Sequence, residues 1–145
     1  MNSADILHQA RFEELPLHNW NRLFAVNVTG TFLMTKLAPA SAAPYARTDR
    51  QPRVDRRQGS QPGLAAYGAT KAAVISLTKS LNAETEADGV RALAICPGFV
   101  DTPMASISSL GGEQMIQPTD VAEVVRMALR LGPTARVPEV LIEIT

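Results

Sequence analysis

A tyrosine and a lysine stand four residues apart near the middle of the chain, at Tyr67 and Lys71. In a helix, side chains at this spacing emerge on the same face, so the phenol and the ammonium are expected to lie close together. A tyrosine normally keeps its proton up to about pH 10, and a neighbouring positive charge favours the phenolate. The pair could therefore act as a general acid/base near neutral pH.

By itself, the pair is a weak signal. A tyrosine and a lysine at this spacing arise by chance in many chains, as an exposed aromatic ring beside a solvated lysine. Asn27, however, lies on the apolar stripe of an expected helix, where a polar amide needs a hydrogen-bonding partner or a function. A bond to a neighbouring backbone group explains Asn27 equally well. The turn Pro97-Gly98 directly follows an apolar run. Together with Asn27, this turn favours the interpretation of Tyr67 and Lys71 as part of a functional site.

Three helices are expected to position these residues, because apolar residues recur every three to four positions. The first runs from Pro16 to about Ala38, and the second, rich in alanine, runs from Leu64 to about Ala87 with Gly89 as its stop. The third begins at Pro118 and ends before Gly132. Its apolar stripe comprises Val121, Val124, Val125, Ala128 and Leu129.

Two strands are expected to alternate with these helices. Val90 to Cys96 is a short apolar run, which is typical of a strand buried on both faces of a parallel sheet. Val140 to Ile144 is expected to be a final strand. The order helix, gap, helix, strand, helix, strand predicts an α/β sheet with crossover helices.

Residues 41–61 interrupt this pattern. Five arginines lie between Tyr45 and Gln61, and Val54 is the one aliphatic residue larger than alanine in that stretch. Such a composition cannot bury a strand or a helix face, so a solvated or disordered loop is expected there.

Composition excludes several classes of function. The 145 residues include 14 Lys+Arg and 14 Asp+Glu, so no global field attracts nucleic acid, and two aspartates dilute the arginine-rich stretch. The single cysteine, Cys96, excludes internal disulfides and a cysteine-rich zinc site, and no metal site is expected. No stretch has the pattern of a membrane span or a secretory signal, so the expected location is the cytoplasm.

Several motifs, taken in their order and spacing, resemble the short-chain dehydrogenase/reductase family. The resemblance covers nearly the whole chain except about residues 41–61. Asn2-Ser3-Ala4-Asp5 is similar to a degraded form of the family's Asn-Asn-Ala-Gly motif, with Asp5 in place of glycine. The motifs that match are Asn-Val-x-Gly from Asn27, Tyr-x-Ala-x-Lys-Ala-Ala from Tyr67, Pro-Gly-x-Val-x-Thr from Pro97, and Pro-Thr-Asp-Val-Ala from Pro118.

The resemblance implies an NAD- or NADP-dependent oxidoreductase that acts on a small alcohol or carbonyl substrate. Tyr67 would exchange a proton with the substrate oxygen while hydride moves to or from the nicotinamide. Lys71 would favour the Tyr67 phenolate and bind the nicotinamide ribose, and Asn27 would help to hold a water relay behind the lysine. The family also implies a homo-oligomer. The cofactor-binding residues that the resemblance implies are Tyr67, Lys71, Pro97, Gly98, Val100 and Thr102.

Two departures from the family pattern imply an impaired enzyme. The glycine-rich G-x-x-x-G-x-G turn is not found in the sequence, and the family's catalytic serine has no counterpart around Val54 and Asp55. We therefore expect residues 1–145 to form one partial α/β domain, the C-terminal part of a Rossmann-type doubly wound parallel sheet that lacks the first strands and the glycine-rich loop. The alternative is a catalytically inactive fragment that acts as an oligomerisation or interaction module.

Overall fold

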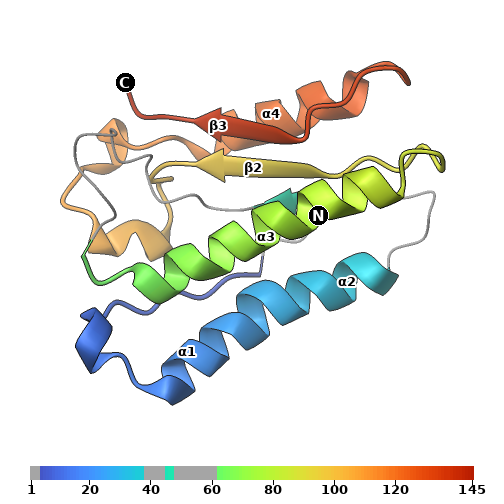
Figure 1. The fold of residues 1–145 in the computed structure, drawn as a ribbon. Helices are drawn as coiled ribbons and strands as arrows, with labels where there is room; N and C mark the ends of the chain where they lie inside the picture. The colour runs from blue at the N-terminus through green and yellow to red at the C-terminus, as the bar shows by residue number, and fades with distance from the viewer. Residues whose placement is uncertain (1–3, 38–44, 48–61) are drawn as a thin grey trace.

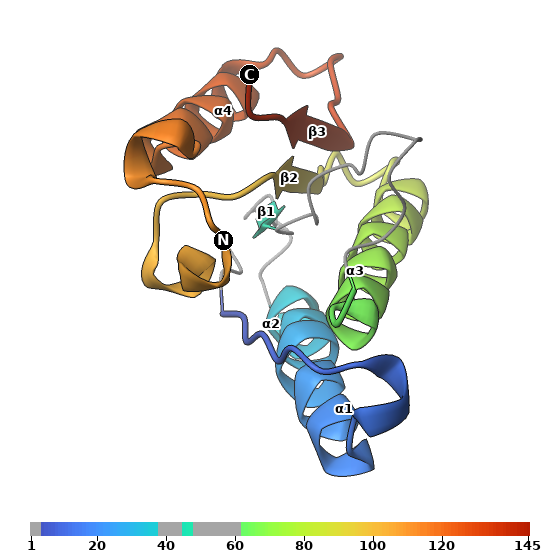
Figure 2. The ribbon, with the colours of Figure 1, turned by 90° about the vertical axis from the view of Figure 1, so that its left-hand side faces the viewer.

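The computed structural model describes residues 4–37, 45–47 and 62–145 of the chain. Three parallel strands lie between helix α4 (Pro118–Arg130) on one face and helix α3 (Ala65–Glu84) on the other (Figures 1 and 2). Helices α1 (Leu17–Phe24) and α2 (Thr31–Leu37) lie alongside α3, beyond the β1 side of the sheet (Figure 2). The expected α/β class with a parallel sheet is confirmed for the described residues.

The sheet has the order β1-β2-β3, and both pairings are parallel. Strand β2 (Leu93–Pro97) is central, and all five of its residues are buried. Strand β3 (Glu139–Ile142) pairs with it so that Cys96 faces Leu141 in the register. The apolar run before Pro97 therefore forms the doubly covered strand that its composition predicts.

Strand β1 (Tyr45–Arg47) corrects the expectation of a loop throughout residues 45–61. It pairs with β2 in the register Tyr45 to Leu93 and Arg47 to Ile95. Parallel pairing uses backbone N–H and C=O groups, so three residues can join a ladder without an apolar side-chain pattern. The remainder of the arginine-rich stretch lies outside the described residues.

Helices α3 and α4 confirm the expected second and third helices with small shifts at their ends. Pro118 occupies the first turn of α4, and the Asp120 carboxylate accepts a hydrogen bond of 2.9 Å from the backbone N–H of Gln117. Gly89 adopts a φ of +69°, which suits glycine, in the turn after α3. The inclusion of Leu129 in the apolar stripe of α4 is wrong, because Leu129 is 60% exposed.

The expected first helix is also present, but its hydrogen-bonding pattern changes along its length. Between α1 and α2, residues Ala25–Gly30 form a π-helical segment, η2, that contains Asn27. Such π segments are frequently found at functional sites. Leu23, at 0% exposure, carries the apolar face of this helical stretch into the core.

Two apolar clusters hold these layers together. The larger one packs β2 and β3 against α4 and includes Leu93, Ile95 and Val121. The smaller one packs the start of α3 against α1 and the segment before it, and includes Leu23 and Tyr67. Three short 3-10 turns complete the described chain at Phe12–Glu14, Pro103–Ile107 and Gly112–Gln114.

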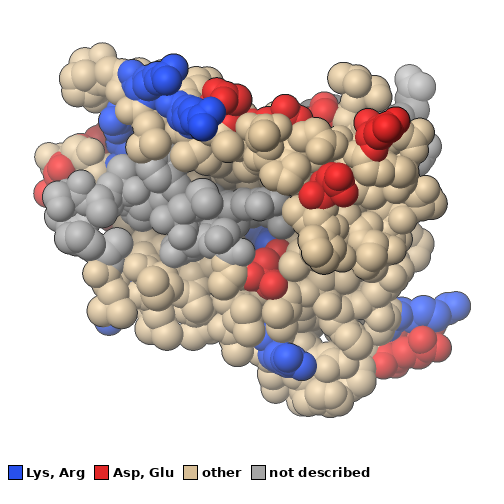
Figure 3. All heavy atoms as spheres, turned by 180° about the vertical axis from the view of Figure 1, so that it is seen from behind, with Lys and Arg blue, Asp and Glu red and all other residues tan. Residues whose placement is uncertain are grey.

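The surface seen from behind carries acidic and basic side chains interspersed with uncharged ones (Figure 3). This view agrees with the equal numbers of acidic and basic residues in the sequence. Among the described residues, no helix is long and apolar enough to cross a membrane.

Candidate active site

Helix α3 presents Tyr67 and Lys71 one turn apart near its N-terminal end. The Lys71 ammonium lies 4.8 Å from the centroid of the Tyr67 ring, and the two residues are 5% and 4% exposed, respectively. This burial contradicts the explanation of the pair as an exposed tyrosine beside a solvated lysine. A positive charge held against a buried phenol is an arrangement suited to proton transfer.

Asn27 connects the segment before α1 with α3. Its Oδ1 accepts a hydrogen bond of 2.9 Å from the backbone N–H of Ile6, and its Nδ2 donates to the backbone C=O of Ile6 at 2.9 Å. Nδ2 also lies 3.3 Å from the hydroxyl oxygen of Thr70. Asn27 is 2% exposed, so these contacts answer the need of a buried amide for partners. They give Asn27 a structural role, and no contact of this amide with Lys71 is among them.

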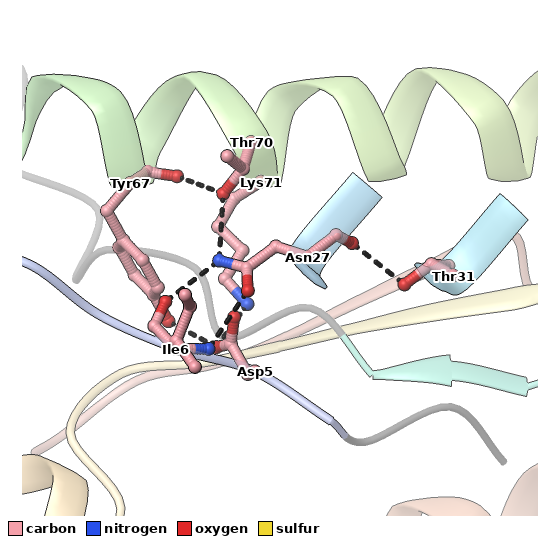
Figure 4. A network of polar contacts seen from close by, with 7 residues as sticks. All are labelled: Asp5, Ile6, Asn27, Thr31, Tyr67, Thr70 and Lys71. Carbon is pink, nitrogen blue, oxygen red and sulfur yellow. Dashed lines mark hydrogen bonds and ion pairs between the residues drawn. The ribbon is translucent and has the colours of Figure 1, made fainter. Parts of the chain in front are cut away.

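Asp5 is a site residue whose contacts the sequence does not predict. Its Oδ2 accepts a hydrogen bond of 2.8 Å from the Tyr67 hydroxyl, and it lies 2.5 Å from Nζ of Lys71 (Figure 4). The Asp5 and Lys71 side chains are 9% and 7% exposed. Its other oxygen, Oδ1, is buried and has no hydrogen-bond partner in the described chain. The one signal in the sequence is the aspartate that stands where the family motif has glycine.

The turn after β2 contains the other residues that the family resemblance singles out. Pro97 ends β2, and the backbone N–H of Gly98 donates to the C=O of Ile142 at 2.9 Å. Val100 is buried, and the Thr102 hydroxyl donates to the Val100 C=O at 3.2 Å. This turn and the first turns of α3 lie at the same end of the sheet (Figure 1).

That end is where the carboxyl termini of the parallel strands meet, which is the usual place for ligands in open α/β sheets. The structure therefore brings Tyr67, Lys71 and Asp5 into contact and places the turn after β2 at the same end of the sheet, where the strands have their carboxyl termini. Within the described residues, no group of three or more His, Cys, Asp or Glu side chains is arranged to hold a metal ion. Cys96 is buried in β2.

Known proteins resemble this chain over most of its length. A family model described as enoyl-(acyl carrier protein) reductase matches residues 1–137. The short-chain dehydrogenase srdC of Neurospora crassa is 30% identical over 157 residues, which cover 97% of this chain and 56% of the relative. The inactive 2-(S)-hydroxypropyl-CoM dehydrogenase 2 of Xanthobacter autotrophicus is 34% identical over 112 residues, which cover 69% of this chain and 44% of the relative.

A solved structure agrees with these relatives. The alcohol dehydrogenase of the archaeon Thermococcus sibiricus, complexed with 5-hydroxy-NADP, matches with a TM-score of 0.76 at 26% identity. That match covers 96% of this chain and 59% of the archaeal protein. The chain thus spans between 44% and 59% of the length of these three proteins.

Proposed function

Because the chain belongs to the short-chain dehydrogenase/reductase family, we propose that it carries the proton-transfer part of an NAD(P)-dependent oxidoreductase site for an alcohol or carbonyl substrate. The observation that supports this most directly is the buried pair of Tyr67 and Lys71, one helical turn apart at the carboxyl end of the parallel sheet. The NADP derivative in the alcohol dehydrogenase of Thermococcus sibiricus supports the cofactor class.

In this proposal, Tyr67 gives its hydroxyl proton to the substrate oxygen during reduction and takes it back during oxidation. The Lys71 ammonium stabilises the phenolate that the transfer leaves behind. Asn27 holds the segment before α1 against α3 through Ile6 and Thr70. In the proposed site, Asn27 would also help to hold the water relay that the family resemblance implies behind Lys71. The turn Pro97–Thr102 would face the nicotinamide.

The nicotinamide nucleotide does not fit the site as it stands. The Lys71 ammonium, which the proposal assigns to the ribose, is already paired with Asp5 at 2.5 Å. The sequence also contains no G-x-x-x-G-x-G turn to hold a pyrophosphate at a helix N-terminus. We therefore propose that this chain forms one partial domain whose catalytic activity is impaired.

A chimera tests the proposed reaction. The family pattern places the glycine-rich turn before the region that this chain matches, so the chimera joins that first region of the Neurospora crassa relative to residues 1–145. The chimera also carries Asp5→Gly, because glycine is the residue of the family motif at this position. This substitution frees the Tyr67 hydroxyl and the Lys71 ammonium from their contacts with the Asp5 carboxylate. Turnover of the chimera is followed as carbonyl-dependent oxidation of NADPH.

We expect slow turnover, because loss of the donor supplied by the family's serine costs on the order of 10²–10³ in rate. Tyr67→Phe in the chimera should abolish turnover, and Tyr45→Phe, the matched control on β1, should preserve it. Equal turnover in the Tyr67→Phe chimera would contradict the proposed function, as would a chimera that binds NADPH but shows no turnover.

A second candidate function is supported by a groove between α2 and α3. The groove has a volume of about 290 Å³, and its lining includes Phe32 and Leu77, which are 47% and 38% exposed. Apolar grooves of this kind accept helices from partner proteins. In this alternative the chain is an interaction module that associates with a second copy of itself through the α2–α3 groove.

A further inference from the structure

The position of Asp5 is fixed by the chain that directly follows it. The next residue, Ile6, is held at its N–H and its C=O by the side-chain amide of Asn27, each at 2.9 Å. Further along, the backbone N–H of Ala10 donates to the C=O of Gly63 at 3.0 Å, just before α3 begins. The segment that carries Asp5 is therefore tied both to η2 and to the start of α3, and its carboxylate is aimed at Tyr67 (Figure 4).

One oxygen of Asp5 engages both groups that proton transfer requires. Oδ2 accepts the hydrogen bond of the Tyr67 hydroxyl at 2.8 Å and pairs with the Lys71 ammonium at 2.5 Å. A phenol that donates to a carboxylate cannot at the same time donate to a substrate oxygen. The negative charge also opposes formation of a phenolate next to it and offsets the positive charge of Lys71.

We propose that Asp5 is an internal inhibitory residue, which occupies the Tyr67 hydroxyl and the Lys71 ammonium in place of substrate and cofactor and holds Tyr67 as a neutral phenol. The contact is between the chain's own residues, so it does not require a bound ligand. The inference concerns the ionisation of Tyr67 and can be tested whether or not the proposed oxidoreductase reaction takes place.

Charged groups face the Tyr67 phenol from the segment before α1 and from α3. The segment before α1 contributes Asp5, and α3 contributes Lys71. The neighbouring part of α1 contributes Leu23 and Trp20, which carry no charge. Asp5 and Lys71 therefore each place a charge directly against this phenol.

The oxygen of Asp5 that has no hydrogen-bond partner in the described chain, Oδ1, makes a matched substitution available. Because Oδ1 has no partner in the described chain, Asp5→Asn can place its Nδ2 there and keep an acceptor oxygen toward Tyr67 and Lys71. This substitution removes the charge with little change in volume. Asp5→Gly additionally removes the acceptor.

The experiment measures ionisation of Tyr67 by tyrosinate absorbance after rapid pH jumps, which record the signal before base unfolds the protein. The sequence has two tyrosines, so the background carries Tyr45→Phe and Tyr67 gives the whole signal. We expect Asp5→Asn and Asp5→Gly to lower the ionisation midpoint by about one pH unit or more. The exposed carboxylate of Glu13 provides the control, since Glu13→Gln should leave the midpoint unchanged.

An unchanged or higher midpoint in Asp5→Asn, with the helical circular dichroism retained, would overturn the proposal. If Asp5→Asn does not fold, the ionisation midpoint of Tyr67 is measured in Asp5→Gly, and an unchanged or higher midpoint there would overturn the proposal. Loss of the helical signal in both variants would assign Asp5 a purely structural role and would also overturn the proposal. Lys71→Met adds a check of sign, because removal of the positive charge should raise the midpoint.

Discussion

At the scale of single residues, the central feature is a buried ion pair between Lys71 and Asp5, whose side chains are 7% and 9% exposed. Removing two charges from water is costly, and their attraction offsets that cost only when the geometry is close. Lys71 also lies over the ring of Tyr67, which adds a cation–π contact. The contributions of Lys71 and Asp5 to the free energy of unfolding are therefore expected to depend on each other.

We predict that Lys71→Met lowers the free energy of unfolding by about 3–5 kcal/mol, because it leaves the Asp5 carboxylate buried without its partner. Combining it with Asp5→Asn should cost less than the sum of the two single substitutions, with a coupling of at least about 1 kcal/mol. Urea unfolding of the four proteins measures this cycle.

The exposed pair of Arg126 and Glu123 on α4 supplies the control for the cycle. Arg126→Met should change the free energy of unfolding by less than about 1 kcal/mol, since exposed ion pairs contribute little. Additive effects of Lys71→Met and Asp5→Asn would show that the buried pair is not coupled.

At the scale of elements, α3 connects the sheet to the helical segment that precedes it. The Asn82 side chain bonds both the N–H and the C=O of Ala92 at 2.8 Å, which fixes the last turns of α3 to the start of β2. The opposite end of α3 packs Tyr67 against Leu23. Between these ends, the α2–α3 groove leaves Leu77 and Phe32 partly exposed.

If the α2–α3 groove is an interface with a second copy, Leu77→Lys should weaken self-association at least tenfold, equivalent to about 1.4 kcal/mol. The reason is that a charge would have to be buried at the contact. Light scattering coupled to size-exclusion chromatography over a concentration series measures the dissociation constant.

Leu129→Lys is the matched control, because Leu129 is an exposed leucine on α4, away from the groove. It should leave the dissociation constant unchanged. A chain that stays monomeric throughout the series, or two variants that associate alike, would rule out the α2–α3 groove as the interface.

At the scale of the whole molecule, the described sheet has three strands, with β1 and β3 at its two edges. The chain spans 56% of the Neurospora crassa relative and 59% of the archaeal alcohol dehydrogenase. We propose that it corresponds to the part of the family fold that carries the acid/base pair, and that the glycine-rich cofactor-binding turn belongs to the part it does not match.

Sequence patterns predict the elements that are governed by local chemistry. Apolar periodicity and Pro118 locate α4, and a continuous apolar run locates β2. Tyr67 and Lys71 are predicted to share a face because both lie on one helix. Strand β1 is missed because its pairing with β2 joins backbone groups, which three residues can do without an apolar sequence pattern.

Asp5 is missed for a different reason. Its partner Lys71 is 66 positions away in the sequence, so the contact depends on how the segment before α1 crosses the start of α3. Neither periodicity nor spacing carries that information.

We propose that this chain retains a proton-transfer pair but lacks a usable nicotinamide site. Fluorescence titration of NADPH with the 145-residue chain tests it most directly, with the full-length Neurospora crassa relative as a comparison. We predict no saturable binding in the micromolar range, since Asp5 occupies Lys71 and the sequence has no glycine-rich turn. Saturable micromolar binding of NADPH by this chain would contradict the claim.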